Sequence, residues 1–154
     1  MRAVVVERPG GPEALTLVEV SEPVAGPDEV LVAVEAVGVN PVDAKIREGA
    51  MVDPAATPAF PLVLGVEAAG VVVATGSDVD GFTKGDEVMG KAAPDHGTYA
   101  EHAVLLASSC VAKPPQLSFA AAATVSRLKM SFSMSCIVFG LRATSARVVI
   151  ISVT

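Results

Sequence analysis

The sequence predicts a mainly β domain, a barrel or sandwich of at least six short strands with short helices between them. Three observations support this fold class. Short runs rich in valine recur along the chain, and clusters of glycine and proline separate them as turns. Hydrophobic residues make up 51% of the 154 residues, so the chain can bury a core of the size expected for one domain.

Three of the expected strands lie in the first 39 residues. They cover residues 2–7, 15–20 and 30–39, and turn clusters occupy 9–12 and 27–29. The third strand alternates, with Val30, Val32 and Val34 on one side and Glu35 on the other. This period of two is typical of a strand with one buried face.

A short helix is expected directly after the third strand. Asn40 suits the N-cap, and Pro41 suits the first helical position, where its missing N–H has no partner within the helix. Asp43 lies in the first turn, where the helix dipole favours negative charge. We expect the helix to run to about Glu48 and to stop at Gly49.

Prolines and glycines mark the expected loops and bends in the rest of the chain. Prolines predict a loop over 50–61, and glycines mark bends or close backbone contacts in a β-rich stretch over 62–76. Further strands are expected over 86–90 and 97–110, the latter continuing to Val111. Ser118 is suited to cap a helix over 120–123.

Charge divides the chain unevenly. The formal net charge is -6, which argues against a nucleic-acid partner. Residues 1–125 carry seven basic and 17 acidic side chains, whereas residues 126–154 carry four basic and no acidic ones. Such a step indicates a boundary near Val125.

The expected location is the cytoplasm. Two cysteines, Cys110 and Cys136, are too few for a disulfide scaffold and fit a reducing compartment. The first residues lack the pattern of a signal peptide, and no apolar run reaches the roughly 18 residues that a membrane helix needs.

Six segments carry a resemblance to a known family. They are MRAVVVERPGGPEAL at the start, GVNPVDAKIREG at 38–49, FPLVLGVEAAGVVVATGSDV at 60–79, FTKGDEVMG at 82–90, GTYAEHAV at 97–104 and KPPQLSFAAAAT at 113–124. In this order and spacing they resemble the GroES-like catalytic domain of the medium-chain dehydrogenase/reductase superfamily. The branch they resemble is that of the zinc-independent quinone oxidoreductases and 2-alkenal reductases, the zeta-crystallin-like group. The resemblance implies a GroES-like, partly open β-barrel with short helices.

The resemblance stops at Val125. Members of the superfamily continue into a Rossmann domain, whose glycine-rich turn approaches the cofactor pyrophosphate, but Gly140 is the only glycine in 126–154. We therefore expect a GroES-like domain over 1–125 and a divergent tail over 126–154. An altered reading frame, a truncated gene, a splice-like variant and genuine divergence all remain open as origins of this tail.

The resemblance implies an oxidoreductase. Its family mechanism is hydride transfer from NADPH to a quinone or to the β-carbon of an α,β-unsaturated carbonyl, with this chain carrying the substrate-side half. The implied partner is a small-molecule substrate. The alternative is a catalytically inactive fragment or a binding and dimerisation module, and an apolar flank left without its Rossmann partner would favour self-association.

Metal ligands are the next point of comparison with the superfamily. Zinc-dependent members place a cysteine where this sequence has Asn40 and a histidine where it has Val66, so only Glu67 of that set remains. His96 and His102 are expected to be surface or strand residues near a turn. We expect no metal site.

The candidate catalytic residues are Asn40 and Lys45, and the candidate cofactor contacts are Asn40 and Pro41. The resemblance places Asn40 at the nicotinamide end of the cofactor and near the substrate carbonyl, although the residue is also a plain N-cap candidate. Lys45 could polarise the substrate oxygen or pair with a cofactor phosphate, or it could be a solvated lysine. Glu67 is expected near the floor of the site.

Overall fold

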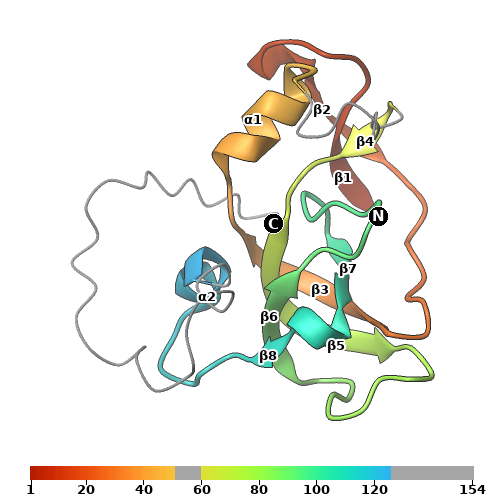
Figure 1. Cartoon of the computed structure of the whole chain (residues 1–154), viewed down its shortest axis with the longest axis vertical. Helices are drawn as coiled ribbons and strands as arrows, with labels where there is room; N and C mark the ends of the chain where they lie inside the picture. The colour runs from red at the N-terminus through yellow and green to blue at the C-terminus, as the bar shows by residue number, and fades with distance from the viewer. Residues whose placement is uncertain (51–59, 126–154) are drawn as a thin grey trace.

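The computed structural model describes residues 1–50 and 60–125. In these residues the chain forms eight strands, two α-helices and two 3-10 turns (Figure 1). In chain order they are β1 (Arg2–Val6), η1 (Pro12–Ala14), β2 (Leu15–Glu19), β3 (Glu29–Val37), α1 (Pro41–Arg47), β4 (Leu62–Val63), β5 (Glu67–Thr75), β6 (Glu87–Lys91), β7 (His102–Leu106), η2 (Ala107–Ser109), β8 (Val111–Ala112) and α2 (Phe119–Val125). Most of the expected loop over 50–61 and all of the expected tail over 126–154 lie outside the described residues.

The strands form two antiparallel sheets. The larger sheet has the order β7-β3-β5-β6-β8, and the smaller has the order β2-β1-β4. Figure 1 shows α1 beside the smaller sheet and α2 beside the larger one. The described strands do not close into a single ring, so the prediction of a mainly β, GroES-like and partly open fold with short helices is confirmed.

The segment before β7 joins the two sheets through β1. Ala3 pairs with Ala100 as an isolated bridge, and the Val4 N–H donates to the Tyr99 carbonyl at 2.8 Å. The main core lies between the sheets, where Val6 of β1 packs in one cluster with Val30 and Val32 of β3. The contact of β1 with residues 99–100 thus holds the two sheets together around a shared core.

The third expected strand is present as β3, at the centre of the larger sheet. Val30 and Val32 are fully buried and Glu35 is exposed, as the alternation predicts. Leu31 points to the other face and is also buried, in a second cluster with Val104. The first half of β3 is therefore covered on both faces. The alternation in the sequence predicted only one buried face.

The expected strand over 97–110 is shorter than predicted. Only His102–Leu106 forms β7, because the preceding residues leave the sheet: the Thr98 and Tyr99 N–H groups both donate to the Leu64 carbonyl. The residues after β7 turn into η2. Sequence periodicity could not show this, because the partner that captures residues 98–99 lies more than 30 positions earlier in the chain.

Both expected helices are present. α1 begins after the N-cap Asn40, and Gly49 follows its last turn at φ 82°, in the left-handed region that glycine adopts without strain. At α2 the Ser118 Oγ accepts a hydrogen bond from the Ala121 N–H at 3.2 Å. α2 lies against β3 and β5, so that it borders the segment from which α1 begins.

Candidate functional site

The candidate site is built where β3 ends and α1 begins. Asn40 has an extended backbone (φ -116°, ψ 152°), and its N–H donates to the Asp43 Oδ2 at 2.7 Å. The Asp43 N–H returns a bond to the Asn40 carbonyl at 3.0 Å. Asn40 and Asp43 form a capping box, so the N-cap expected at Asn40 and the helix-start role expected for Asp43 are both present.

The Asn40 side chain contacts Glu67, which is at the first position of β5. The Asn40 Nδ2 donates to the Glu67 Oε1 at 3.1 Å, and Glu67 is only 2% exposed. A carboxylate accepts hydrogen bonds and does not donate them, so the amide must turn its nitrogen toward Glu67. Two residues that are 27 positions apart in the sequence thereby meet. The buried Glu67 contacts Asn40 from the side of the protein interior.

α2 closes one side of this pair. A Cβ added at Gly38 would lie 3.1 Å from the Ala123 carbonyl oxygen, 3.5 Å from the Glu67 Cγ and 3.6 Å from the Asn40 Nδ2. Gly38 therefore allows the end of β3 to approach both the site and the helix closely. Ala122 and Ala123 of α2 are themselves buried against the sheet.

Asp43 has contacts beyond the helix start. This buried carboxylate also accepts from the Tyr99 hydroxyl at 3.0 Å and from the Gly65 N–H at 3.3 Å. Burial raises the pKa of Tyr99, and the negative charge of Asp43 and its hydrogen bond raise it further. The sequence contains no local signal for the bond from Tyr99 to Asp43, because the two residues are 56 positions apart in the chain.

Pro41 and Lys45 lie on the outer side of α1. Both are exposed, whereas Asp43 and Arg47 of the same helix are buried. The helix thus brings Asn40 to Glu67 and leaves the Lys45 side chain to solvent. The catalytic roles expected for Asn40 and Lys45 and the cofactor contacts expected for Asn40 and Pro41 stay predictions.

A cavity of about 600 Å³ lies between α1, β4 and the loop at 95–97. Its lining includes Asp43, Ile46, Val66, His96 and His102, but none of the predicted site residues. The cavity therefore adjoins the core-facing side of α1, and the predicted site is at the start of that helix.

The two histidines flank this cavity. His102 is at the first position of β7, and its Nδ1 lies 2.9 Å from the Glu22 Oε1. In residues 1–50 and 60–125, no three His, Cys, Asp or Glu side chains gather as a metal site would require. Over the same residues, neither helix has the length and apolar character that spanning a membrane requires.

Comparison with known proteins shows which family this chain matches and which proteins it resembles. A sequence model of the family described as "Alcohol dehydrogenase GroES-like domain" matches residues 26–115. The chain is 40% identical over 119 residues to the chloroplastic quinone-oxidoreductase homolog of Spinacia oleracea, covering 75% of this chain and 35% of that protein. It is 36% identical over 126 residues to the quinone oxidoreductase of Homo sapiens, covering 81% and 37%.

Solved structures agree with the sequence comparison. The quinone oxidoreductase from Coxiella burnetii has a TM-score of 0.74 at 35% identity and is matched over 80% of this chain and 40% of that one. The Escherichia coli quinone oxidoreductase complexed with NADPH has a TM-score of 0.71 at 32% identity, over 80% and 36%. The present chain thus spans between a third and two fifths of the length of these relatives.

Proposed function

The chain belongs to the family of alcohol dehydrogenase GroES-like domains, and from that premise we propose that residues 1–125 form the substrate-side domain of an oxidoreductase. Its reaction is the reduction of a quinone or an α,β-unsaturated carbonyl by hydride from NADPH. The similarity to quinone oxidoreductases, one of them described in complex with NADPH, supports this reaction class.

The observation that carries the proposal is the contact of Asn40 with Glu67. The pair fixes the side-chain amide at a domain surface with its nitrogen directed to a buried carboxylate at 3.1 Å. An amide NH₂ has two hydrogens, and Glu67 Oε1 receives one of them. An amide held in one orientation is suited to recognise the polar atoms of a substrate carbonyl or a nicotinamide.

The described residues fit one end of NADPH. Asn40 provides an amide and Pro41 a rigid exposed ring at the same corner of the fold, which suits the nicotinamide end. Within residues 1–50 and 60–125 there is no glycine-rich turn between a strand and a helix of the kind that receives a pyrophosphate. When bound, the cofactor supplies the hydride, and this chain supplies orientation.

The chain's own residues would stabilise the oxygen that becomes negative. Hydrogen-bond donors aimed at such an oxygen lower the barrier most where water is excluded. We assign this role to Asn40, and a second one to the ammonium of Lys45, which is exposed on α1. The amide at position 40 and the apolar Val66 replace metal-binding side chains, which supports a zinc-free mechanism.

Two finer points belong to the same proposal. The low cysteine content favours a cytoplasmic location, since only two cysteines occur in 154 residues and Cys110 is buried. Self-association through an apolar surface is also proposed, and the exposed Leu15 and Leu17 on the edge strand β2 support it.

The test is NADPH binding by calorimetry, followed by NADPH consumption with a quinone and with an enone. We expect Asn40→Ala to lower turnover about 100–1000-fold, because it removes a donor to the developing negative charge. Lys45→Gln should lower turnover or weaken NADPH binding. Lys84→Gln, which removes an exposed lysine in the loop between β5 and β6, is the matched control and should have no effect.

Two results would contradict the proposal. One is an Asn40→Ala protein that turns over as fast as the parent chain. The other is a folded parent chain that neither binds NADPH nor consumes it with either substrate class, which would favour the inactive or binding-module alternative.

A further inference from the structure

The Asp43 carboxylate is a junction of three segments. It accepts the Asn40 N–H at the start of α1 (2.7 Å), the Gly65 N–H in the turn before β5 (3.3 Å) and the Tyr99 hydroxyl before β7 (3.0 Å). Asp43 is 3% exposed, so these bonds are made away from bulk water. The partner most distant from Asp43 in the sequence is Tyr99, which is 56 positions away.

We propose that Asp43, supported by Tyr99, is a positioning residue that holds the Asn40 amide in register with Glu67. The relevance of this to catalysis rests on the proposed function. The positioning itself is a property of the folded chain, with or without a substrate.

Asn40 and Glu67 are carried by different segments, and their contact needs those segments to be fixed relative to each other. Glu67 begins β5 two residues after Gly65, and Asn40 caps α1 three residues before Asp43. The bond from Gly65 to Asp43 therefore ties the two short stretches of backbone that carry the pair. Loss of that tie would let the start of α1 move against β5.

The turn at Gly65 is itself closely packed. Gly65 has φ 100°, and a Cβ built there would collide with the Thr98 Oγ1 and with the ring of Tyr99. The backbone at Gly65 is thus packed directly against the residue that donates the third bond to Asp43. Tyr99, Asp43 and Gly65 form a closed triangle, and its geometry resists displacement better than a single hydrogen bond would.

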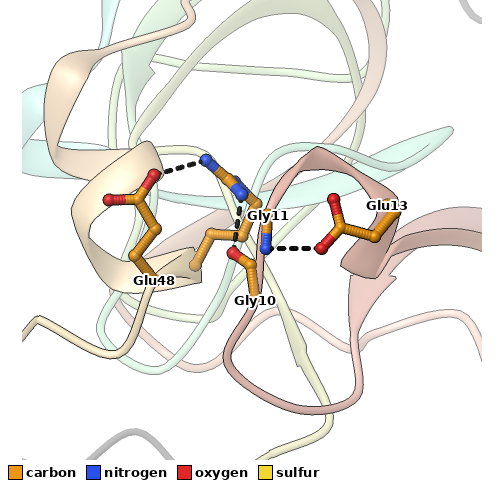
Figure 2. A network of polar contacts seen from close by, with 5 residues as sticks. Gly10, Gly11, Glu13 and Glu48 are labelled. Carbon is orange, nitrogen blue, oxygen red and sulfur yellow. Dashed lines mark hydrogen bonds and ion pairs between the residues drawn. The ribbon is translucent and has the colours of Figure 1, made fainter.

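The other end of α1 provides a matched control. Arg47 is also buried and charged, and its Nη1 donates to the Gly10 carbonyl at 2.6 Å while its Nη2 donates to the Glu48 Oε1 at 2.8 Å. Figure 2 shows Gly10 and Glu48 around this guanidinium. These contacts hold the end of the helix and involve neither Asn40 nor Glu67.

The amino-acid composition lets nuclear magnetic resonance observe the Asn40 side chain directly. Asn40 is the only asparagine and Gln116 the only glutamine in the chain, so a nitrogen-15 spectrum contains two side-chain NH₂ pairs. Gln116 serves as the internal reference, and Gln116→Glu assigns the two pairs because it removes one of them. The spectra of the full 154-residue chain are compared for Asp43→Ala, Tyr99→Phe and Arg47→Met.

We expect the Asn40 NH₂ pair to shift and to exchange with water faster in Asp43→Ala, and about fivefold faster in Tyr99→Phe, which loses one hydrogen bond. In Arg47→Met the pair should stay in place although the protein is destabilised. If Asp43→Ala does not fold, Tyr99→Phe decides, since it removes only a hydroxyl.

The proposal is overturned if the Asn40 signal in Tyr99→Phe matches that of the parent chain, or if Arg47→Met moves it equally. Neither NADPH nor a substrate is present in these measurements. A chain that shows the positioning effect but no reductase activity would therefore refute the proposed function alone, and an active chain without the effect would refute the positioning alone.

Discussion

Tyr99 titrates in an environment that disfavours its charged form. Its pKa is raised above the ordinary value of 10.0, first by burial and then by the charge and hydrogen bond of Asp43. Tyr99 is the only tyrosine and the chain has no tryptophan, so tyrosinate absorbance reports on this residue alone. We expect the folded chain to show no tyrosinate at about pH 10, where a solvated tyrosine is half ionised.

The same shift makes stability depend on alkaline pH. Because the folded state holds the proton more tightly than the unfolded state, the contribution of Tyr99 is fully present below about pH 10 and falls as pH rises toward the folded-state pKa. Urea unfolding at increasing pH measures this loss, and Tyr99→Phe should remove that component. Tyrosinate appearing at the ordinary pKa while the chain is still folded would contradict the expectation.

At the residue scale, contacts between neighbouring residues could be predicted from the sequence, and contacts between residues far apart in the chain could not. The capping residues Asn40 and Asp43 could be predicted because a helix N-terminus is specified within four residues. The contacts of Asn40 with Glu67 and of Asp43 with Tyr99 depend on how β5 and the segment before β7 pack. No spacing in the sequence encodes such packing.

At the element scale, one lysine anchors α2. The Lys113 side chain is 6% exposed, and its Nζ lies 2.8 Å from both the Glu87 Oε2 and the Leu117 carbonyl oxygen and 5.0 Å from the Phe119 ring centre. We expect Lys113→Met to destabilise the chain by about 1–3 kcal/mol, because it removes charge-assisted bonds while keeping similar apolar bulk. Urea unfolding measures the loss.

The location of the effect can be checked separately. Hydrogen exchange should accelerate most in α2, since Leu117 and Phe119 flank its start. Lys84→Met is the control, because Lys84 is exposed and we expect no measurable change. Unchanged protection of the α2 amides in Lys113→Met would show that packing of Ala122 and Ala123 alone holds the helix.

The elements themselves were largely predictable, and their ends less so. Valine-rich alternation located β3, and turn residues located α1 and α2. The strand expected over 97–110 was too long because the Leu64 carbonyl captures residues 98 and 99 before β7 begins. A strand ends where its partner ends, and that information belongs to the tertiary structure.

At the scale of the whole molecule, β1 links the two sheets. The mainly β class could be predicted from the valine-rich runs and the glycine and proline turns between them, but the order of the strands in the sheets could not. β1 pairs with β2 and β4, which are its neighbours in the smaller sheet, and also contacts residues 99–101. That second contact joins the sheets, and it places Tyr99 beside Asp43.

An ion pair reinforces the same link and makes it sensitive to acid. The Arg2 guanidinium lies 2.7 Å from the Glu101 Oε1, and the Arg2 N–H donates to the Glu101 Oε2 at 2.7 Å. The backbone hydrogen bond, followed by the side-chain bond of Arg2, lowers the pKa of Glu101 below its ordinary 4.5. The contribution of Glu101 is therefore present above about pH 4.5 and is lost as pH falls through the folded-state pKa.

We accordingly expect Glu101→Gln to lower the stability of the chain slightly at neutral pH and to flatten its decline in acid. Added salt should reduce the difference between the two proteins, because the pair is partly exposed to solvent. Urea unfolding between about pH 3 and 7 measures both effects, and Glu35→Gln on the exposed side of β3 is the control. An acid dependence in Glu101→Gln equal to that of the parent chain would show that the backbone bonds of β1 join the sheets without help from this pair.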